Sequence, residues 1–273
     1  MAASNGHAFL SGTLGPGIDV CRLGISGSYR PGERVILEAL DAGVNYVFCY
    51  GFDSQTIRAL RSLPPSRRDG VVIATGAYNL IWGHTNLRQT LERRLRQLRT
   101  DRIDVFQFLG VMRPQQFPER IRDELLRLRE SGHVRQVAIS THDRKFAGTL
   151  AAEGALDVLM IRYNAAHRGA EREIFPYRMN GRPAIVSYTA TRWTKLLRAP
   201  RGWPRGGPVP TAGDCYRFVL GNPNVDVCLM APRSAKELHD NLAAAHRGPL
   251  APHETAWMHE FGDAVHARGG WFM

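Results

Sequence analysis

The sequence predicts an α/β fold of the (β/α)8, or TIM-barrel, type, in one domain that covers residues 1–273. The chain is 44% hydrophobic and 22% charged, a composition that supports one large buried core. Short apolar runs alternate with longer amphipathic segments, which is the pattern of repeated strand and helix units in a parallel sheet. Eight such units fit a closed barrel better than an open, doubly wound sheet.

The expected strands are short apolar runs of about five residues. Their number is what favours the barrel over an open sheet. In chain order they are Arg22–Ile25, Val44–Phe48, Val71–Thr75, Ile103–Phe108, Val134–Ser140, Val158–Ile161, Ala184–Tyr188 and Val225–Leu229.

The amphipathic segments between these runs are expected to form helices, the first of which begins with a proline. They cover Pro31–Ala42, Ser54–Leu63, Asn86–Leu98, Pro118–Ser131, Asp143–Ala152, Ala170–Tyr177, Ala212–Leu220 and Ala235–Ala245. Before the helix at Ala212, residues 198–211 are rich in proline and glycine, which predicts a long loop over the active face of the barrel.

An extra helix, His253–Ala267, is expected to close the chain. Its large apolar residues recur at helical spacing, which is typical of a face that packs on the rest of the fold. These residues are Trp257, Met258, Phe261 and Val265.

The composition argues against several classes of protein. The first residues, MAASNGHAFLSGTLG, lack the basic and apolar regions of a signal peptide, and no run of about 18 apolar residues indicates a membrane span. We therefore expect a cytoplasmic protein without a membrane partner. The four cysteines, Cys21, Cys49, Cys215 and Cys228, form no CxxC pair, which predicts reduced thiols rather than disulfides or a zinc site.

The formal net charge of +11 raises the question of a nucleic-acid partner. Lysine occurs only at Lys145, Lys195 and Lys236, and the arginines alternate with acidic residues along the expected helices, as on a solvated face. No nucleic-acid-binding motif accompanies the charge. We expect a small molecule as the partner and no nucleic acid, and the oligomeric state stays open.

Segments along nearly the whole chain resemble the aldo-keto reductase family in order and spacing. The family's opening β-hairpin and first strand resemble SGTLGPGIDVCRLGISG, and the next helix and strand resemble ALDAGVNY. Later segments of the family resemble LRQTLERRLRQLRTDRIDVF, SGHVRQVAIST, VLMIRYN and CYRFVLGNPNVDVCLMAPRSAKELHDN. The resemblance implies a barrel with an N-terminal hairpin. It also implies NADPH-dependent reduction of carbonyl compounds, with a tyrosine as the acid and a lysine, a histidine and an aspartate that assist it. A proton donor is needed because hydride transfer leaves negative charge on the carbonyl oxygen.

The residues at the catalytic positions implied by this resemblance differ from those of the family. Phe48 stands at the aspartate position, Gly76 at the lysine position and Leu109 at the histidine position. The tyrosine position is Asp53 if the alignment has no gap, or Tyr50 if the preceding loop is shorter. The sequence therefore predicts a divergent member that lacks most or all of the usual tetrad.

The cofactor side resembles the family more closely. Ser140 stands where the family holds the carboxamide of nicotinamide, and Tyr188 where an aromatic ring stacks on it. Thr141 and Met160 replace amide side chains that usually assist. The segment PRSAKEL is either a phosphate and adenine loop or simply a capped helix start, so NADP(H) binding stays open. The residues of this loop that the resemblance assigns to the cofactor are Arg233, Ser234, Glu237 and Asn241.

The carboxyl ends of barrel strands face the reaction site, and four candidate catalytic residues lie there. Tyr50 follows the second expected strand, His142 the fifth, and Arg162 and His167 the sixth. The histidines are candidates for proton transfer because imidazole titrates near neutral pH. Arg162 either anchors a carboxylate or phosphate, or pairs with an acid such as Glu171. With Glu171 the two histidines could form a metal site of two histidines and one carboxylate, but their spacing is not diagnostic and we expect no metal.

Two further side chains near strand ends have ordinary structural roles as alternatives to catalytic ones. Cys49 is either a nucleophile or a packed thiol. His84 is placed to cap the helix that follows it.

Three functions are consistent with these residues. The first is an NADP(H)-binding oxidoreductase with a rebuilt active site, in which Tyr50 or a histidine donates the proton. The second is a cofactor-independent lyase or isomerase that uses His142 or His167 as acid and base, with Arg162 holding an anionic substrate. The third is a non-catalytic pseudoenzyme that binds NADPH.

Overall fold

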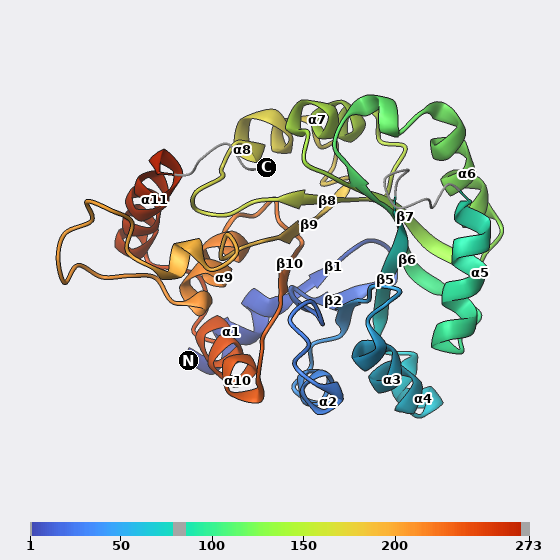
Figure 1. Cartoon of the computed structure of the whole chain (residues 1–273), viewed down its shortest axis with the longest axis horizontal. Helices are drawn as coiled ribbons and strands as arrows, with labels where there is room; N and C mark the ends of the chain where they lie inside the picture. The colour runs from blue at the N-terminus through green and yellow to red at the C-terminus, as the bar shows by residue number, and fades with distance from the viewer. Residues whose placement is uncertain (1, 79–85, 269–273) are drawn as a thin grey trace.

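The strands of the computed structural model, which describes residues 2–78 and 86–268, form a closed barrel. Within this part of the chain eight parallel strands follow one another around the ring, and β10 pairs with both β9 and β3 to close it (Figure 1). The predicted (β/α)8 fold is confirmed. The strands are β3 (Leu23–Ser26), β4 (Tyr46–Phe48), β5 (Val72–Tyr78), β6 (Ile103–Val111), β7 (Val134–Thr141), β8 (Val158–Arg162), β9 (Ala184–Tyr188) and β10 (Val227–Met230).

A two-stranded hairpin, β1 (Ser11–Thr13) and β2 (Asp19–Cys21), covers the amino-terminal end of the barrel. Leu14 in its turn is fully buried and belongs to the apolar cluster inside the barrel. Gln136, near the start of β7, donates a hydrogen bond of 2.7 Å to the carbonyl oxygen of Leu14. The amino-terminal end is therefore closed by the hairpin, and ligands enter from the carboxyl ends of the strands. Helix α1 (Ala2–Leu10) precedes the hairpin and was not predicted.

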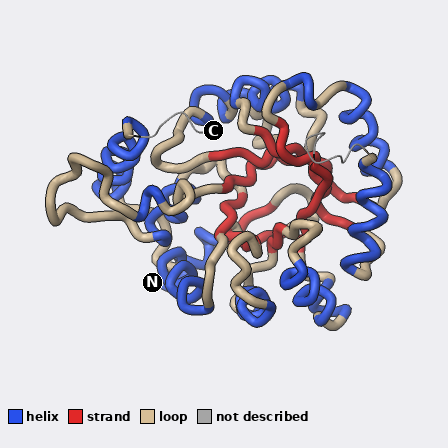
Figure 2. The backbone as a smooth tube through the Cα atoms, viewed as in Figure 1, coloured by secondary structure: helices blue, strands red, loops and turns tan. Residues whose placement is uncertain are grey.

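Helices surround the strands on the outside (Figure 2). The helix expected over Ala170–Tyr177 divides into α8 and a 3-10 turn, and α4 is a short helix that the apolar pattern does not predict. Side-chain caps explain several helix starts, among them Asn86 at α5; His84, the expected cap, lies outside the described residues. The helices are α2 (Glu33–Asp41), α3 (Ser54–Ser62), α4 (Pro65–Arg68), α5 (Leu87–Leu98), α6 (Glu119–Glu130), α7 (Arg144–Glu153), α8 (Ala170–Glu173), α9 (Ala212–Gly221), α10 (Ala235–Ala245) and α11 (Pro252–Ala267). Short 3-10 turns lie at Pro114–Gln116, Phe175–Tyr177 and Lys195–Leu197.

The apolar side chains form two layers. Alternate strand residues point outward to the helices or inward to the barrel axis, as the period of two in a strand requires. The inner layer contains large side chains such as Tyr46, Phe48 and Met160, so the barrel is filled rather than hollow. In the outer layer, the predicted packing of α11 is confirmed because Met258, Phe261 and Val265 are buried.

The loop over residues 198–211 extends from the barrel beside α11 (Figure 1). The ring of Trp203 in this loop lies 4.7 Å from the ring of Phe261 in α11, in an edge-to-face arrangement. This contact places the loop against the C-terminal helix rather than across the mouth of the barrel, where the sequence had suggested it.

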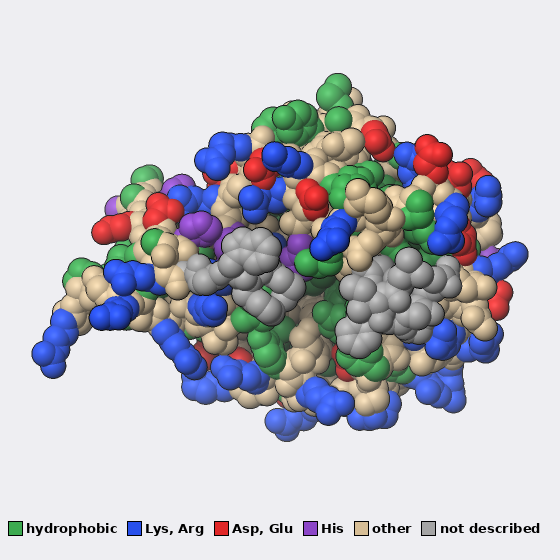
Figure 3. Space-filling model, turned by 45° about the horizontal axis from the view of Figure 1, so that its top comes forward, with side chains coloured by type: hydrophobic (Ala, Val, Ile, Leu, Met, Phe, Trp, Pro, Cys, Tyr) green, Lys and Arg blue, Asp and Glu red, His purple; other side chains and the backbone are tan. Residues whose placement is uncertain are grey.

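Basic side chains are spread over the surface with acidic ones between them (Figure 3). None of the helices in residues 2–78 and 86–268 combines the length and the apolar character needed to cross a membrane.

Candidate active site

Two cavities open at the carboxyl end of the barrel. The inner cavity, of about 270 Å³, is lined by Tyr50, His142 and Tyr188 among others. The outer cavity, of about 540 Å³, lies between the end of β9 and helices α9 and α10. The two share four lining residues, so they adjoin each other. The shared residues are Tyr29, Thr191, Tyr216 and Ala231.

Tyr50 stands in an aromatic corner of the inner cavity. Its ring lies edge to face with Phe48 at 4.7 Å and is stacked on Phe52 and Tyr78 at 5.2 and 6.3 Å. The hydroxyl hydrogen-bonds with Ser28. Burial raises the pKa of Tyr50 above its ordinary value of 10, so the hydroxyl keeps its proton at neutral pH.

Tyr188 and His142 form a hydrogen-bonded pair on the opposite wall. The Tyr188 hydroxyl lies 3.0 Å from Nε2 of His142, and the two rings are perpendicular at 5.6 Å. Tyr188 also hydrogen-bonds with Ser140, so the two residues that the sequence assigned to nicotinamide are in contact with each other. These bonds fix the Tyr188 ring in one orientation at the end of β9.

Arg162 lies opposite Tyr188 in the register of β8 and β9. Met160, two residues earlier on the same face of β8, lines the inner cavity, so Arg162 belongs to the rim above it. The expected alternative, an ion pair with Glu171, is wrong, since the Tyr163 hydroxyl donates to the Glu171 carboxylate at 2.6 Å instead. Within the described residues Arg162 has no ion pair, and its buried Nη1 atom lacks a hydrogen-bond partner.

His167 lies apart from the two cavities, toward α11. Its ring is perpendicular to that of His266 at 5.2 Å. Gly262 of α11 permits this approach, because a Cβ atom there would lie 2.2 Å from the carbonyl oxygen of Ala165. Tyr50 and His142 therefore line the same cavity as Tyr188, whereas His167 does not. Arg162 links the two histidines electrostatically, because its charge lowers the pKa of both.

The positions that resemble the family's lysine, aspartate and histidine lie inside the barrel. Phe48 and Leu109 belong to the inner apolar layer. At Gly76 a Cβ atom would lie 2.0 Å from the carbonyl oxygen of Gln107 on the neighbouring strand. No side chain fits there unless the backbone moves, so Gly76 is a requirement of this packing.

The two candidate tyrosine positions have different roles. Asp53 is the N-terminal cap of α3: its carboxylate accepts hydrogen bonds from the backbone N–H and the hydroxyl of Thr56, at 3.2 and 2.6 Å. Asp53 is therefore engaged in structure, whereas Tyr50 lines the cavity.

The outer cavity is walled by the start of α10. Arg233, Glu237 and Asn241 line it, and Ser234 caps the helix by accepting from the backbone N–H of Glu237 at 3.3 Å. Arg233 donates through Nε to Glu237 at 3.2 Å. In the contacts of the described residues, the two terminal nitrogens of its guanidinium have no partner, so they can bind a ligand. The segment is thus a capped helix start and a cavity wall at once.

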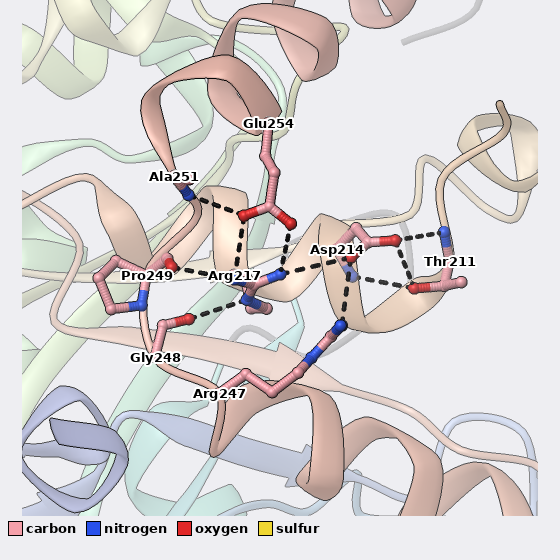
Figure 4. Close-up of polar contacts among 8 residues, drawn as sticks. All are labelled: Thr211, Asp214, Arg217, Arg247, Gly248, Pro249, Ala251 and Glu254. Carbon is pink, nitrogen blue, oxygen red and sulfur yellow. Dashed lines mark hydrogen bonds and ion pairs between the residues drawn. The ribbon is translucent and has the colours of Figure 1, made fainter. Parts of the chain in front are cut away.

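A polar network behind this wall ties three helices together (Figure 4). Arg217 of α9 donates to the carbonyl oxygens of Gly248 and Pro249 and to the carboxylate of Glu254 at the start of α11. Its neighbour Asp214 pairs with Arg247, a residue that lines the outer cavity. The network therefore sets the distance between α9, α10 and α11.

Several lining residues were missed by the sequence analysis. Ser28 and Tyr29 follow the first barrel strand, so the rule of strand ends that identified Tyr50 could have identified them too. The loop after β9 carries a different signal, visible only in the backbone: Thr189, Arg192, Trp193 and Thr194 have positive φ angles, which non-glycine residues adopt at a cost in free energy. The missed residues are Ser28, Tyr29, Thr191, Trp193 and Tyr216.

Other candidate chemistry is weaker. Cys49 is buried and its burial raises the pKa of the thiol to about 12, so it is a packed thiol rather than a nucleophile. In the part of the chain that the structure describes, no three His, Cys, Asp or Glu side chains gather as metal ligands.

The histidine environments predict how stability depends on pH. Burial, followed by the charge of Arg162, lowers the pKa of His142 from 6.5 to about 4 and that of His167 to about 3. Below pH 6.5 the unfolded chain therefore binds more protons than the folded one, and stability falls as the pH falls. We expect His142 to reduce the free energy of unfolding by about 1 kcal/mol between pH 7 and pH 5.5, and the half-buried His167 by less because solvent screens it, in urea titrations.

The control is the double variant His142→Gln, His167→Gln, in which this part of the pH dependence disappears while that of the carboxylates remains. Equal slopes for the two proteins would show that the histidines are not held neutral.

Comparison with known proteins agrees with this architecture. None of the curated protein sequences matches the chain. Solved structures of similar fold include an aldo-keto reductase, AKR11C1, from Bacillus halodurans in its holo form (TM-score 0.75, 20% identity, 92% of this chain and 95% of that one). Another is an aldo/keto reductase from Klebsiella pneumoniae in complex with NADP and acetate (TM-score 0.72, 20% identity, 90% of this chain and 92% of that one). The sequence profile of the Aldo/keto reductase family matches residues 33–200. The match covers more than half of the sequence, and the chain belongs to the aldo/keto reductase family.

Proposed function

We propose that this protein binds NADP(H) along the two adjoining cavities and reduces a small carbonyl compound, with Tyr50 as the proton donor. The observation that carries the proposal is the adjacency of the two cavities, which together extend from Tyr50 and Tyr188 at the barrel mouth to Arg233 at the start of α10. A dinucleotide is an extended ligand with an aromatic ring at one end and a phosphate-bearing ribose at the other, so it needs a site of this form.

The residues present fit the two ends of the cofactor. At the inner end, Tyr188 offers an aromatic ring whose orientation is fixed by Ser140 and His142. At the outer end, Arg233 offers the planar fork that suits a phosphate, next to the N-terminus of α10. The similar Klebsiella pneumoniae protein was solved with NADP, which supports the same ligand here.

The chemistry at the inner cavity follows from the state of its side chains. When bound, NADPH supplies a hydride to a carbonyl carbon, which leaves negative charge on the carbonyl oxygen. Tyr50 holds a proton at its phenolic oxygen, where burial keeps the hydroxyl protonated. His142, with a pKa of about 4, is neutral at pH 7 and serves to orient Tyr188 rather than to donate a proton. Position 76 is a glycine, so no lysine there lowers the pKa of Tyr50. We therefore expect Tyr50 to be a weaker acid, and turnover to be slower, than with a tyrosine whose pKa is lowered in this way.

The cofactor is tested by titrating the purified protein with NADPH and NADH and following the quenching of protein fluorescence. We expect Arg233→Ala to weaken NADPH binding about tenfold or more, because a charge-assisted hydrogen bond to the 2′-phosphate is lost, and to leave NADH nearly unaffected. Arg205→Ala, which removes an exposed arginine from the loop over residues 198–211, is the matched control.

Equal losses for the two cofactors would exclude a 2′-phosphate site at Arg233. If the wild-type protein bound neither cofactor, the reductase and the NADPH-binding pseudoenzyme would both be excluded, and cofactor-independent chemistry by His142 would be the function left.

A further inference from the structure

Three arginines and two histidines lie near one another between the end of β8 and α11, and the arginines carry the positive charge. We call Arg144, Arg162, Arg192, His167 and His266 the cationic cluster. The charges of all four other members act on His167, and those of Arg144 and Arg192 act on Arg162. Figure 3 shows histidine side chains gathered on one part of the face, with arginine and lysine side chains around them. Such a concentration of one sign of charge costs free energy unless an anion compensates it.

Arg162 is the member without compensation. Arg144 pairs with Glu173, and Arg192 donates to the carbonyl oxygen of Val265 at 2.6 Å. Arg162 has a buried nitrogen, Nη1, with no hydrogen-bond partner among residues 2–78 and 86–268, and burial lowers the pKa of its guanidinium. A guanidinium retained in this state is poorly explained by stability alone, since an unpaired buried donor destabilises the fold.

The acidic side chains of the surrounding segment do not neutralise it, because each is engaged elsewhere. They are Glu171, which accepts from Tyr163; Glu173, which pairs with Arg144; and Asp263, which accepts from Arg168 at 2.8 Å.

The position of Arg162 connects the cluster to the inner cavity. It is the register partner of Tyr188, and its charge acts on both Tyr188 and His142, which line that cavity. An oxyanion bound at the guanidinium would therefore lie beside Tyr188, which lines the inner cavity.

We propose that the substrate carries an anionic group, a carboxylate or phosphate, that binds to Arg162 at the rim while its carbonyl group lies in the inner cavity. The proposal rests on the proposed function for the carbonyl group, but the anion site stands on the unpaired Nη1 atom of Arg162 and its position beside Tyr188. The planar fork of arginine matches both oxyanions, and the remaining members of the cluster raise the local concentration of either.

The test measures anion binding to the full chain without any reaction. Benzoate, inorganic phosphate and the neutral analogue benzamide are titrated by calorimetry at constant ionic strength. We expect one of the two anions to bind to the wild-type protein and benzamide to bind at least about tenfold more weakly, since only the anions meet the unpaired guanidinium. Whether benzoate or phosphate binds more tightly identifies the kind of oxyanion.

Two variants assign the site. Arg162→Gln should weaken anion binding about tenfold or more and should raise the melting temperature, because an uncompensated charge is removed. Arg205→Gln changes the net charge equally on an exposed loop and should change neither. Anion binding to the wild-type protein should also raise the pKa of His167, followed by proton NMR of its ring.

The proposal is overturned if no anion binds to the wild-type protein, if benzamide binds as well as benzoate, or if Arg162→Gln leaves binding unchanged. A lower melting temperature for Arg162→Gln with unchanged anion binding would show that the arginine has a structural role instead. NADPH titrations of Arg162→Gln separate this result from the proposed function, because cofactor binding should be retained whether or not the anion site exists.

Discussion

Arg217→Gln is expected to lower the free energy of unfolding by about 3 kcal/mol, since it removes the hydrogen bonds of a buried guanidinium to two carbonyl oxygens and to a partly exposed carboxylate. Arg217 is only 5% exposed. It donates to the carbonyl oxygens of Gly248 and Pro249 at 2.8 and 3.0 Å and to the Glu254 carboxylate at 3.2 and 3.3 Å. Glutamine cannot reach these acceptors together. Urea unfolding followed by circular dichroism measures the loss.

Arg247→Gln is the matched control for this change. The side chain of Arg247 is 57% exposed and contacts the same network through Asp214, at 3.4 Å. Exposed ion pairs contribute about 1 kcal/mol or less, so we expect a small effect. If the two variants were destabilised equally, the network in Figure 4 would not be the element that joins α9 to α11.

Tyr50→Phe is expected to lower kcat for NADPH-dependent carbonyl reduction about 100-fold or more, which is the range for loss of a general acid. The phenylalanine ring keeps the packing against Phe48 and Tyr78, so the structure of the cavity should not change. NADPH affinity should also be retained. The measurement is the rate of NADPH oxidation at saturating cofactor with a panel of aldehydes and ketones.

The control for this variant is Tyr46→Phe. The Tyr46 hydroxyl is buried inside the same barrel and has no hydrogen-bond partner in the described part of the chain, so its removal should leave kcat unchanged and stability equal or higher. Full activity of Tyr50→Phe would exclude Tyr50 as the proton donor. Binding of NADPH to a wild-type protein that reduces no carbonyl compound would instead favour the pseudoenzyme.

The barrel strands could be predicted because the signal for each is local. The run Val158–Ile161, for example, is apolar throughout, as expected of a parallel strand covered on both faces, and it reappears in β8. The caps were local as well: Ser234 precedes Glu237 by three residues, and the hydrogen bond follows from that spacing.

The partners of polar side chains could not be predicted in the same way. Arg162 and Glu171 are close in sequence and opposite in charge, yet the carboxylate accepts from Tyr163, which itself packs between Phe175 and Phe218. The partner of the Glu171 carboxylate therefore depends on how α8 and α9 pack against each other. The packing of the apolar side chains, more than the attraction between charges, determines which partner is within reach.

The sequence by itself determined that eight strand and helix units form a barrel, and which strand ends carry ionisable side chains. Only the tertiary structure decided that Tyr50 and His142 share a cavity, that His167 faces α11, and that position 76 has no room for a side chain. The physical reason is one of range. Periodicity and capping act over a few residues, whereas a cavity is made by residues far apart in the chain, whose distances depend on the closure of the barrel and the paths of its loops.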